Sequence, residues 1–194
     1  MGERLTNIEN EKIVRRGYNK IASKYNETRN RFTNNIELEY FVKLLPEEAR
    51  ILDAGCGAGV PIAKFLVERG FSVTGIDIST KMLEIARKQV PEAKFIEGDM
   101  TKFSLPDESF HGIVSLYAII HVPREKHEQV FQNFYRLLRP NGILFLCTGP
   151  VRARAHPSPE KSLSWLRNAG FEIIRDEILV RGGEKQYWIF ARKK

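Results

Sequence analysis

The chain has 194 residues, 42% of them hydrophobic, and a formal net charge of +7 at pH 7. This length suits one domain with a single sizeable core, and no stretch approaches the roughly 20 apolar residues that span a bilayer. The two cysteines, Cys56 and Cys147, lack the spacing of a disulfide framework or a zinc site. We therefore expect a cytoplasmic protein without a signal peptide, a membrane span or a metal.

The basic charge is dispersed along the chain. Arg15 and Arg16 lie in the N-terminal segment, Arg152 and Arg154 lie in a late loop, and residues 192–194 end the chain. No recognition helix, zinc finger or RNA-binding aromatic signature accompanies these charges. Solvated surface is therefore favoured, and nucleic acid is disfavoured as a partner.

Helical spacing marks the N-terminal segment. Ile21, Ala22 and Tyr25 follow Tyr18 at i+3, i+4 and i+7, so one helical face is predicted to carry all four. A second short helix is predicted over 36–45.

Strand and helix patterns then alternate. In chain order the patterns predict strands over 51–54, 71–76, 94–97, 112–116 and 143–147, and helices over 61–69, 81–88 and 124–138. Such alternation predicts a parallel sheet covered on both faces. Two further strands, 171–180 and 186–191, are separated by the hairpin signal Arg181-Gly182-Gly183-Glu184. One antiparallel strand is therefore expected to close the sheet.

A glycine-rich turn, Asp53-Ala54-Gly55-Cys56-Gly57-Ala58-Gly59, stands where the first strand meets the first helix. Glycines there let a ligand approach the main chain, so the turn predicts a cofactor site, although a tight turn without a ligand is the alternative. A dinucleotide fingerprint requires its third glycine where Val60 stands. The Asp53 carboxylate would oppose a pyrophosphate but could accept from an ammonium group. The turn thus favours a cationic amino-acid moiety.

Two more acids follow strands. Asp77 ends the second strand, where nucleotide-binding folds place a carboxylate that holds ribose hydroxyls; a helix cap is the alternative. After the third strand, Asp99 could accept from an exocyclic amine and Met100 could lie on a purine face. Turn chemistry alone would also explain the pair Gly98-Asp99.

Together these features resemble class I S-adenosylmethionine-dependent methyltransferases. The segments that carry the resemblance are 53–59, Asp77, 98–99, 110–115 and 138–144. The resemblance runs from about Tyr18 to the C-terminus and implies an α/β, Rossmann-like, doubly wound seven-stranded sheet, mostly parallel with one antiparallel strand near the C-terminus. It also implies covering helices over 1–45 and a methyltransferase domain over 46–194 that binds S-adenosyl-L-methionine.

Carried over position by position, the resemblance implies the residues that contact the cofactor. The predicted cofactor-binding residues are Tyr18, Tyr25, Asp53, Gly55, Cys56, Gly57, Gly59, Asp77, Ile78, Asp99, Met100 and Ser115. The glycines would line the methionine part and Asp77 would hold the ribose. Asp99 and Met100 would meet the edge and face of the adenine beside Ile78, and Tyr25 would close over the cofactor.

The histidines are ranked by their place relative to the strands. His121 follows the fourth strand and His156 the fifth, so both can face the acceptor beyond the carboxyl ends. His121 is the candidate catalytic base, with a structural bond to a nearby loop as the alternative. His127 lies among charged residues and is expected at the surface. Trp165 and Trp188 are expected in the core.

Two departures from the family pattern bear on the acceptor side. His111 stands where many relatives have aspartate, at the start of the fourth strand, where only local hydrogen bonds are expected to change. The segment 148–160 is short, which predicts an open pocket or a homodimer in which another subunit completes it. No Asn-Pro-Pro-aromatic segment follows the fourth strand, and this absence favours a small-molecule acceptor.

The sequence thus predicts methyl transfer to a small-molecule acceptor by direct displacement, driven mainly by proximity and orientation. A nicotinamide-dependent oxidoreductase is an alternative that Val60 and Asp53 count against. A non-catalytic protein that binds S-adenosylmethionine or nucleic acid is another.

Overall fold

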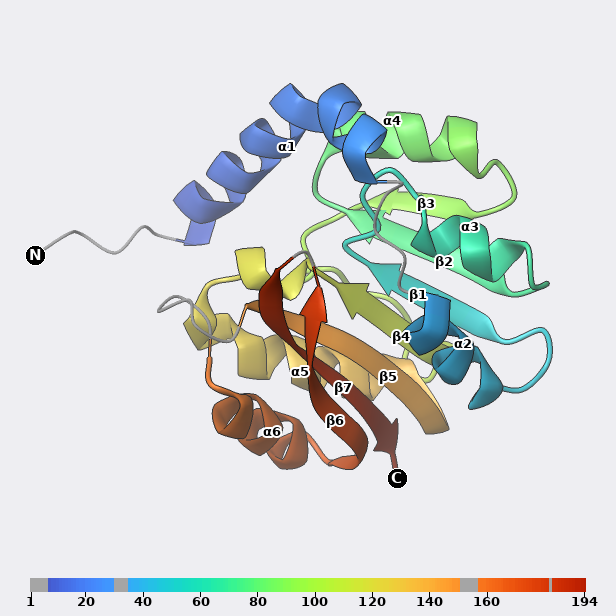
Figure 1. Ribbon diagram of the computed structural model, residues 1–194, viewed down its shortest axis with the longest axis vertical. Coiled ribbons are helices and arrows are strands. Elements are labelled where there is room, and N and C mark those ends of the chain that lie inside the picture. Colours follow the sequence, from blue (N-terminus) through green and yellow to red (C-terminus); the bar gives the residue numbers. More distant parts are fainter. Residues whose placement is uncertain (1–6, 30–34, 151–156, 182) are drawn as a thin grey trace, which may run out of the picture.

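The computed structural model of the protein describes residues 7–29, 35–150, 157–181 and 183–194. The strands are β1 (Arg50–Ala54), β2 (Ser72–Asp77), β3 (Lys94–Glu97), β4 (Phe110–Leu116), β5 (Leu138–Pro150), β6 (Phe171–Arg181) and β7 (Glu184–Lys193). They form a seven-stranded sheet in the order β3-β2-β1-β4-β5-β7-β6 (Figure 1). Only β7 is antiparallel to its neighbours, β5 and β6. The predicted fold is confirmed.

Helices cover both faces of this sheet. They are α1 (Asn7–Arg29), α2 (Asn35–Lys43), α3 (Ile62–Val67), α4 (Thr80–Gln89), α5 (His127–Leu137) and α6 (Pro159–Asn168), with short 3-10 turns η1 (Ile119–His121) and η2 (Arg124–Lys126). Buried side chains of α2, α3 and α4 form a cluster on one face, and those of α5 and α6 form a cluster on the other. The helix predicted from residue 124 is a 3-10 turn until His127.

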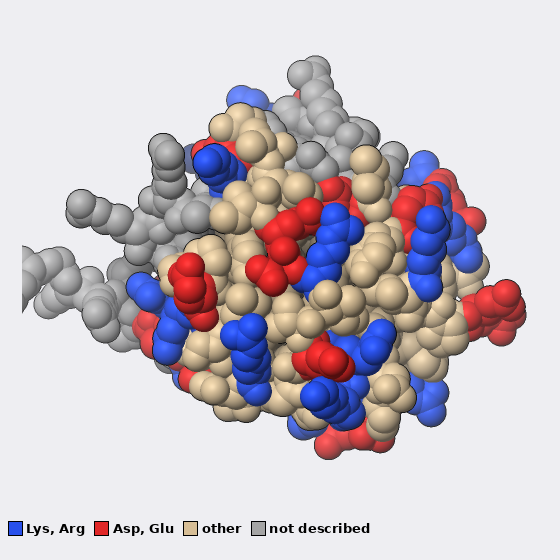
Figure 2. Space-filling model, turned by 60° about the horizontal axis from the view of Figure 1, so that its bottom comes forward, with Lys and Arg blue, Asp and Glu red and all other residues tan. Residues whose placement is uncertain are grey.

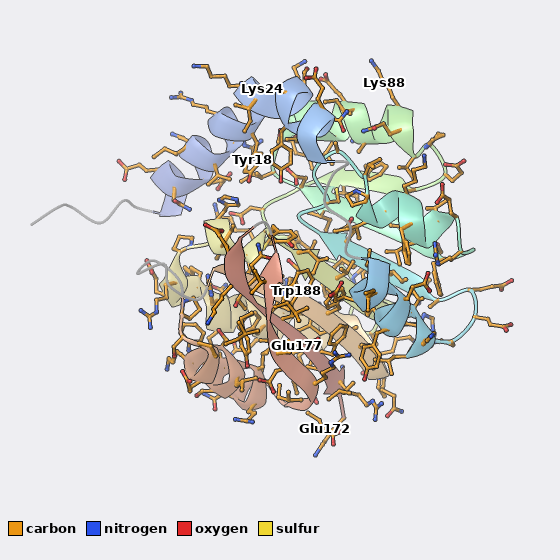
Figure 3. All side chains as sticks on the ribbon, in the orientation of Figure 1. Tyr18, Lys24, Lys88, Glu172, Glu177 and Trp188 are labelled. Carbon is orange, nitrogen blue, oxygen red and sulfur yellow. The ribbon has the colours of Figure 1, made fainter. Side chains whose placement is uncertain are left out.

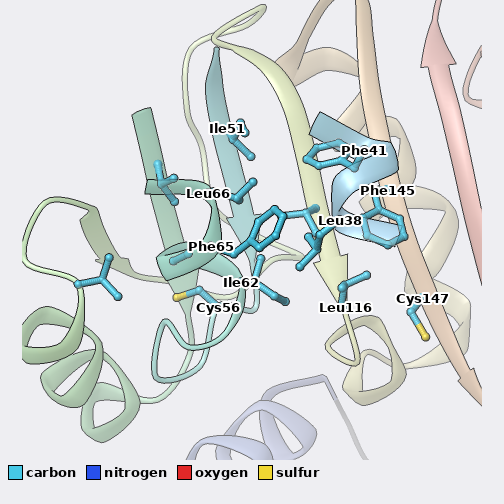
Figure 4. Packing of buried hydrophobic residues seen from close by; sticks show 14 of the residues in the cluster. Leu38, Phe41, Ile51, Cys56, Ile62, Phe65, Leu66, Leu116, Phe145 and Cys147 are labelled. Atoms are coloured by element: carbon cyan, nitrogen blue, oxygen red, sulfur yellow. The ribbon is translucent and has the colours of Figure 1, made fainter. Parts of the chain in front are cut away.

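The cluster on the α2, α3 and α4 face is rich in aromatic residues (Figure 4). Phe145 stacks on Phe190 with ring centroids 4.4 Å apart, and Phe41 of α2 lies 5.7 Å from Phe145. Burial of each such side chain contributes about 1.5–3 kcal/mol. Because Leu38 and Phe41 are fully buried, α2 belongs to the core of the sheet domain. The predicted segment of covering helices, 1–45, thus contains two helices that pack differently, and the division at residue 45 stays a prediction.

Helix α1 is attached by a separate, smaller cluster. Ala22 packs with Ala58 of the glycine turn and Met82 of α4, beside Tyr18 and Tyr25. Tyr18, Ala22 and Tyr25, at positions i, i+4 and i+7, form the inner face of α1. Ile21 was predicted on the same face, but 44% of its surface is exposed, because it lies at the edge of that face, about 100° around the helix from Ala22.

Hydrogen bonds of polar side chains also hold α1 against α4 and the glycine turn. Asn19 Oδ1 accepts from Ser79 Oγ at 2.7 Å and from the Lys81 N–H at 3.2 Å. Gln89 Nε2 donates to Asn26 Oδ1 at 2.9 Å and to the Ala58 carbonyl at 3.0 Å. Helix α1 is thus held over the carboxyl ends of the first strands.

The prediction that His127 lies at the surface is wrong. Its exposed fraction is 1%, Nε2 lies 3.0 Å from the Val122 carbonyl, and the ring packs against Phe131 and Trp165. Helix α6 is the cause, since it lays Trp165 over the start of α5. The burial predicted for Trp165 and Trp188 is confirmed.

The surface fits the predicted dispersal of charge. Figure 2 shows Lys and Arg side chains interspersed with Asp and Glu over the face that it presents. Among the helices of the described residues, none combines the length and apolar composition needed to cross a membrane.

Candidate functional site

A cleft lies at the carboxyl ends of β1, β2, β3 and β4, where α1 forms one wall. It encloses about 1030 Å³ of space, its open mouth included. The predicted site residues that line it are Tyr18, Tyr25, Gly55, Cys56, Gly57, Asp77, Ile78, Asp99, Met100 and His121. The structure therefore brings together residues that the sequence distributes over five separate segments.

The glycine turn forms the floor of this cleft. Gly55 and Cys56 donate their N–H groups to the Ile76 carbonyl, at 2.7 and 3.0 Å, so the turn is tied to the end of β2. A Cβ atom on Gly55 would lie 2.1 Å from the Cβ atom of Ala118, whereas one on Gly57 would meet nothing within 4 Å. Gly55 is thus required for packing. Gly57, with φ of +53°, leaves its backbone open to a ligand.

Asp77 stands beside this open backbone. Its Oδ2 accepts from the Gly57 N–H and its Oδ1 from the Ser79 N–H, both at 2.8 Å. Each carboxylate oxygen keeps acceptor capacity for a further donor. The cap of α4 is Ser79, whose hydroxyl accepts from the Met82 N–H at 3.2 Å. Asp77 is therefore available to a pair of ligand hydroxyls.

Burial raises the pKa of the Asp77 carboxyl, an effect that the backbone N–H groups of Ser79, Gly57 and Ile78 oppose. Burial also raises the pKa of the Cys56 thiol well above its usual value, and the negative charges of Asp53 and Asp77 raise it further. The turn therefore lies in a region of negative potential.

The charged residues of the cleft wall are consistent with this potential. Glu11, Asp77 and Asp99 line the cleft, and no Lys or Arg does so within the described part of the chain. Lys102 pairs with Glu11 and lies 3.8 Å from the Asp99 carboxylate, while Asp77 accepts only from backbone N–H groups among the bonds identified. Such a wall suits a cationic ligand and opposes a pyrophosphate.

Three predicted cofactor residues do not line the cleft. Asp53 is fully buried and acts on the turn through its charge. Ser115 donates to the Ala54 carbonyl at 2.9 Å and so joins β4 to the end of β1. A Cβ atom on Gly59 would lie 3.3 Å from side chains of α4 and β3, so this glycine allows close packing there. Gly59 and Ser115 therefore lie beside the cleft and not on its wall, and their contact with a cofactor stays a prediction.

His121 lies in η1, directly after β4, and faces the cleft. Its Nε2 lies 2.6 Å from the Tyr18 hydroxyl, and the two rings meet edge to face with centroids 5.2 Å apart. Asn10 Nδ2 donates to the His121 carbonyl at 3.0 Å. Helix α1 therefore holds both the ring and the backbone of the histidine. Tyr18 lies on the inner side of α1, whereas Lys24 lies on its exposed side (Figure 3).

Sequence reasoning missed part of the wall. Glu11 and Val14 line the cleft seven and four residues before Tyr18, so extending the helical face toward the N-terminus would have found them. Tyr117 also lines it, with a positive φ of 61° that the residue type does not predict. His156 lies outside the described residues.

His111 takes part in the local hydrogen bonding that the sequence predicts. Its Nδ1 accepts from the Arg50 N–H at 3.0 Å, at the end of the sheet opposite the cleft. The residue is therefore remote from the site.

Replacing Tyr25 by alanine is expected to speed cofactor dissociation about three- to tenfold, since edge-on aromatic pairs contribute roughly 0.5–1.5 kcal/mol. The Tyr25 ring lies 5.6 Å from that of Tyr18 at the cleft wall, where α1 covers the site. Stopped-flow displacement of S-adenosylhomocysteine measures the rate. Lys20→Ala, at an exposed position of α1, is the control. An unchanged dissociation rate in Tyr25→Ala would show that Tyr25 does not cover the cofactor.

Comparisons with known proteins agree with this geometry. A family model described as a methyltransferase domain matches residues 51–142. An uncharacterized methyltransferase of Oceanobacillus iheyensis is 28% identical over 155 residues, which are 77% of this chain and 69% of the relative. A demethylmenaquinone methyltransferase of Chlorobaculum tepidum is 35% identical over 99 residues, which are 51% of this chain and 40% of the relative.

The fold is shared with a solved structure. The 1,6-didemethyltoxoflavin-N1-methyltransferase of Burkholderia thailandensis, solved with 1,6-didemethyltoxoflavin and S-adenosylhomocysteine bound, has a TM-score of 0.80. Its sequence identity is 18%, and the match covers 100% of this chain and 93% of that one. At this identity the likeness shows the fold alone.

The segment matched by the family model contains the glycine turn, Asp77 and Asp99, which are the residues that carry the resemblance in the sequence. The same residues form the cleft or lie directly beneath it. The matched segment, residues 51–142, is therefore a methyltransferase domain, and the motifs within it support the resemblance to class I S-adenosylmethionine-dependent methyltransferases.

Proposed function

We propose that the protein transfers the methyl group of S-adenosylmethionine to a small-molecule acceptor. The observation that carries the proposal is the cleft wall, which presents Glu11, Asp77 and Asp99 and, over the described residues, no Lys or Arg. A ligand with an ammonium and a sulfonium group suits this wall, whereas a dinucleotide would place its pyrophosphate beside carboxylates. When bound, this cofactor supplies an activated methyl group.

The residues present fit that cofactor. The open backbone at Gly57 would receive its methionine part, and the Asp77 carboxylate would accept from both ribose hydroxyls. Asp99 and Met100 would meet the adenine beside Ile78. The protein's main task is then alignment of the two reactants in a site with little water, and orientation by itself can supply several kcal/mol.

The acceptor side of the cleft is mostly apolar around His121. Val14, Leu116, Tyr117 and Val122 line it there. The relatives named for demethylmenaquinone and 1,6-didemethyltoxoflavin act on small molecules, and such an acceptor also fits an apolar wall. These observations support an apolar small molecule as the acceptor of this protein.

His121 would take a proton from an acceptor that must lose one, such as a phenol or an alcohol. The proton would go to Nδ1, because the other ring nitrogen, Nε2, lies 2.6 Å from the Tyr18 hydroxyl and bonds to it. Tyr18 acts here as a positioning residue, because its hydroxyl oxygen accepts from Nε2–H and so fixes the ring orientation with the lone pair on Nδ1. An acceptor that needs no early deprotonation would rely on alignment alone.

Cofactor affinity is expected to fall as the pH is lowered through the raised pKa of Asp77. The carboxylate accepts from both ribose hydroxyls, whereas the protonated acid has lost one acceptor site. Below the pKa of the free protein, the dissociation constant should rise by up to about tenfold per pH unit. Calorimetry with S-adenosylhomocysteine between pH 4.5 and 7.5 measures this dependence. The Asp77→Asn variant should lack it, and an equal slope in both proteins would contradict the assignment.

A metabolite screen that detects release of S-adenosylhomocysteine tests the proposed function. We expect release with an apolar acceptor fraction, and loss of that release in Asp77→Ala. A protein that binds S-adenosylhomocysteine yet releases none with any fraction would instead be a non-catalytic sensor.

A further inference from the structure

A second hollow lies at the amino-terminal end of the strands, opposite the cleft. It spans about 470 Å³ of space, its open mouth included, and Arg50 of β1, Ser72 and Thr74 of β2, Lys94 of β3 and Ser109 contribute to its walls. Two cations and three hydroxyl groups thus line one concavity, and within the described chain no Asp or Glu lines it. The charged residues that line this hollow are basic, whereas those that line the cleft are acidic.

Strand register brings these side chains to one face of the sheet. Arg50 pairs with Ser72, and Thr74 pairs with Lys94. Two residues further along the same strands, Leu52, Ile76 and Ile96 belong to the apolar cluster under α5 and α6. Parallel strands are usually apolar on both faces because helices cover them. Polar residues at this end therefore indicate a part of the face that no helix covers.

The topology explains the missing cover. The connection between β3 and β4, residues 98–109, forms no helix (Figure 1). Leu105 and Pro106 of this connection line the hollow, together with Ile96 and Phe110. An irregular loop thus lies beside the polar side chains where a helix would have covered them.

The positive charge of the hollow is not neutralised by its neighbours. In the part of the chain that the structure describes, neither Arg50 nor Lys94 forms an ion pair. The acids of the adjacent loop are engaged elsewhere, since Asp107 pairs with Arg136 and Glu108 lies 3.3 Å from Lys193 Nζ.

The pKa of His111 is consistent with a positive potential around the hollow. Burial lowers the pKa of this histidine, and the positive charges of Arg139 and Arg50 lower it further. The edge of the sheet around the hollow is therefore electropositive.

We propose that this hollow binds a small anion that carries a phosphate group. A guanidinium, an ammonium and neighbouring hydroxyl groups can all donate to phosphate oxygens, and the charged donors form the stronger bonds. Two cations at the rim of one shallow hollow match one phosphate group, whereas nucleic acid needs a stripe of several phosphate contacts. The hollow shares no lining residue with the cleft, so this inference is independent of the proposed function.

Titration with inorganic pyrophosphate, followed by amide NMR, tests the proposal. We expect saturable shifts of the Ser72, Thr74 and Ser109 amides. The double variant Arg50→Gln/Lys94→Gln should weaken binding by about tenfold or more, since it removes both charge-assisted donors. The matched control Lys43→Gln/Lys88→Gln makes the same change in net charge at exposed positions outside the hollow and should bind within twofold of the unaltered protein. Figure 3 labels Lys88 on α4.

Equal weakening in the two double variants, or shifts that do not saturate, would overturn the site. Tighter binding of a short DNA duplex to the same amides would also overturn it, in favour of nucleic acid. If the Arg50→Gln/Lys94→Gln protein does not fold, Ser72→Asp adds a repelling charge at one exposed position and should abolish the shifts of Thr74 and Ser109.

Discussion

Replacing Asp77 by alanine is expected to weaken binding of S-adenosylmethionine by about 10- to 100-fold, because charge-assisted hydrogen bonds contribute roughly 1.5–3 kcal/mol. The variant loses the proposed acceptor of both ribose hydroxyls. It also releases the Gly57 and Ser79 N–H groups, which the carboxylate holds at 2.8 Å. The glycine turn is then less fixed, and both effects act in the same direction. Calorimetry measures the affinity, and circular dichroism checks the fold.

Asp77→Asn separates the two effects. The amide keeps the size of the side chain and one acceptor oxygen, so part of the turn's support should remain and the loss of affinity should be smaller. A folded Asp77→Ala protein with unchanged affinity would remove Asp77 from the site.

Once an acceptor that must lose a proton is known, His121→Ala is expected to lower turnover about 100-fold or more, within the range of general-base catalysis. Cofactor affinity should stay nearly intact, because the proposed cofactor contacts lie at the glycine turn and after β2 and β3. Steady-state turnover measures the first effect, and calorimetry measures the second. A loss below about threefold is too small for general-base catalysis and would make His121 a structural residue.

Tyr18→Phe is the matched variant for this experiment. It keeps the ring that packs against Tyr25 and His121 but removes the hydroxyl that lies 2.6 Å from Nε2. If Tyr18 positions the base, turnover should fall less than in His121→Ala, and the pH dependence of turnover should shift. An unchanged pH profile would leave Tyr18 with a packing role only.

Local patterns predicted most of the fold. The strand from Lys94 to Glu97 has the predicted bounds, and the glycine turn stands where the sequence places it. Both depend on residues close together in the chain, since glycines allow a turn and apolar runs favour strands. The side-chain cap of α4 is Ser79, and not Asp77 as the alternative interpretation of that acid would require.

Features set by distant segments could not be predicted in the same way. His127 is buried because Trp165 packs on it, and no residue near His127 in the sequence indicates that contact. Tyr18 and His121 were both named as site residues, but the short contact between them joins positions 103 residues apart. Gly59 and Ser115 fit the family motif, yet the structure places them in packing and strand contacts and not on the cleft wall. A motif fixes the turn, whereas tertiary packing decides which of its atoms meet the cleft.

Calorimetric titration of the unaltered protein with S-adenosylhomocysteine, and in parallel with NADH, tests the central claim most directly. The cleft has an open glycine backbone, the carboxylates of Glu11, Asp77 and Asp99, and no Lys or Arg in its described walls. We therefore expect saturable binding of S-adenosylhomocysteine and none of NADH, whose pyrophosphate would face these carboxylates. Binding of NADH alone would contradict the account.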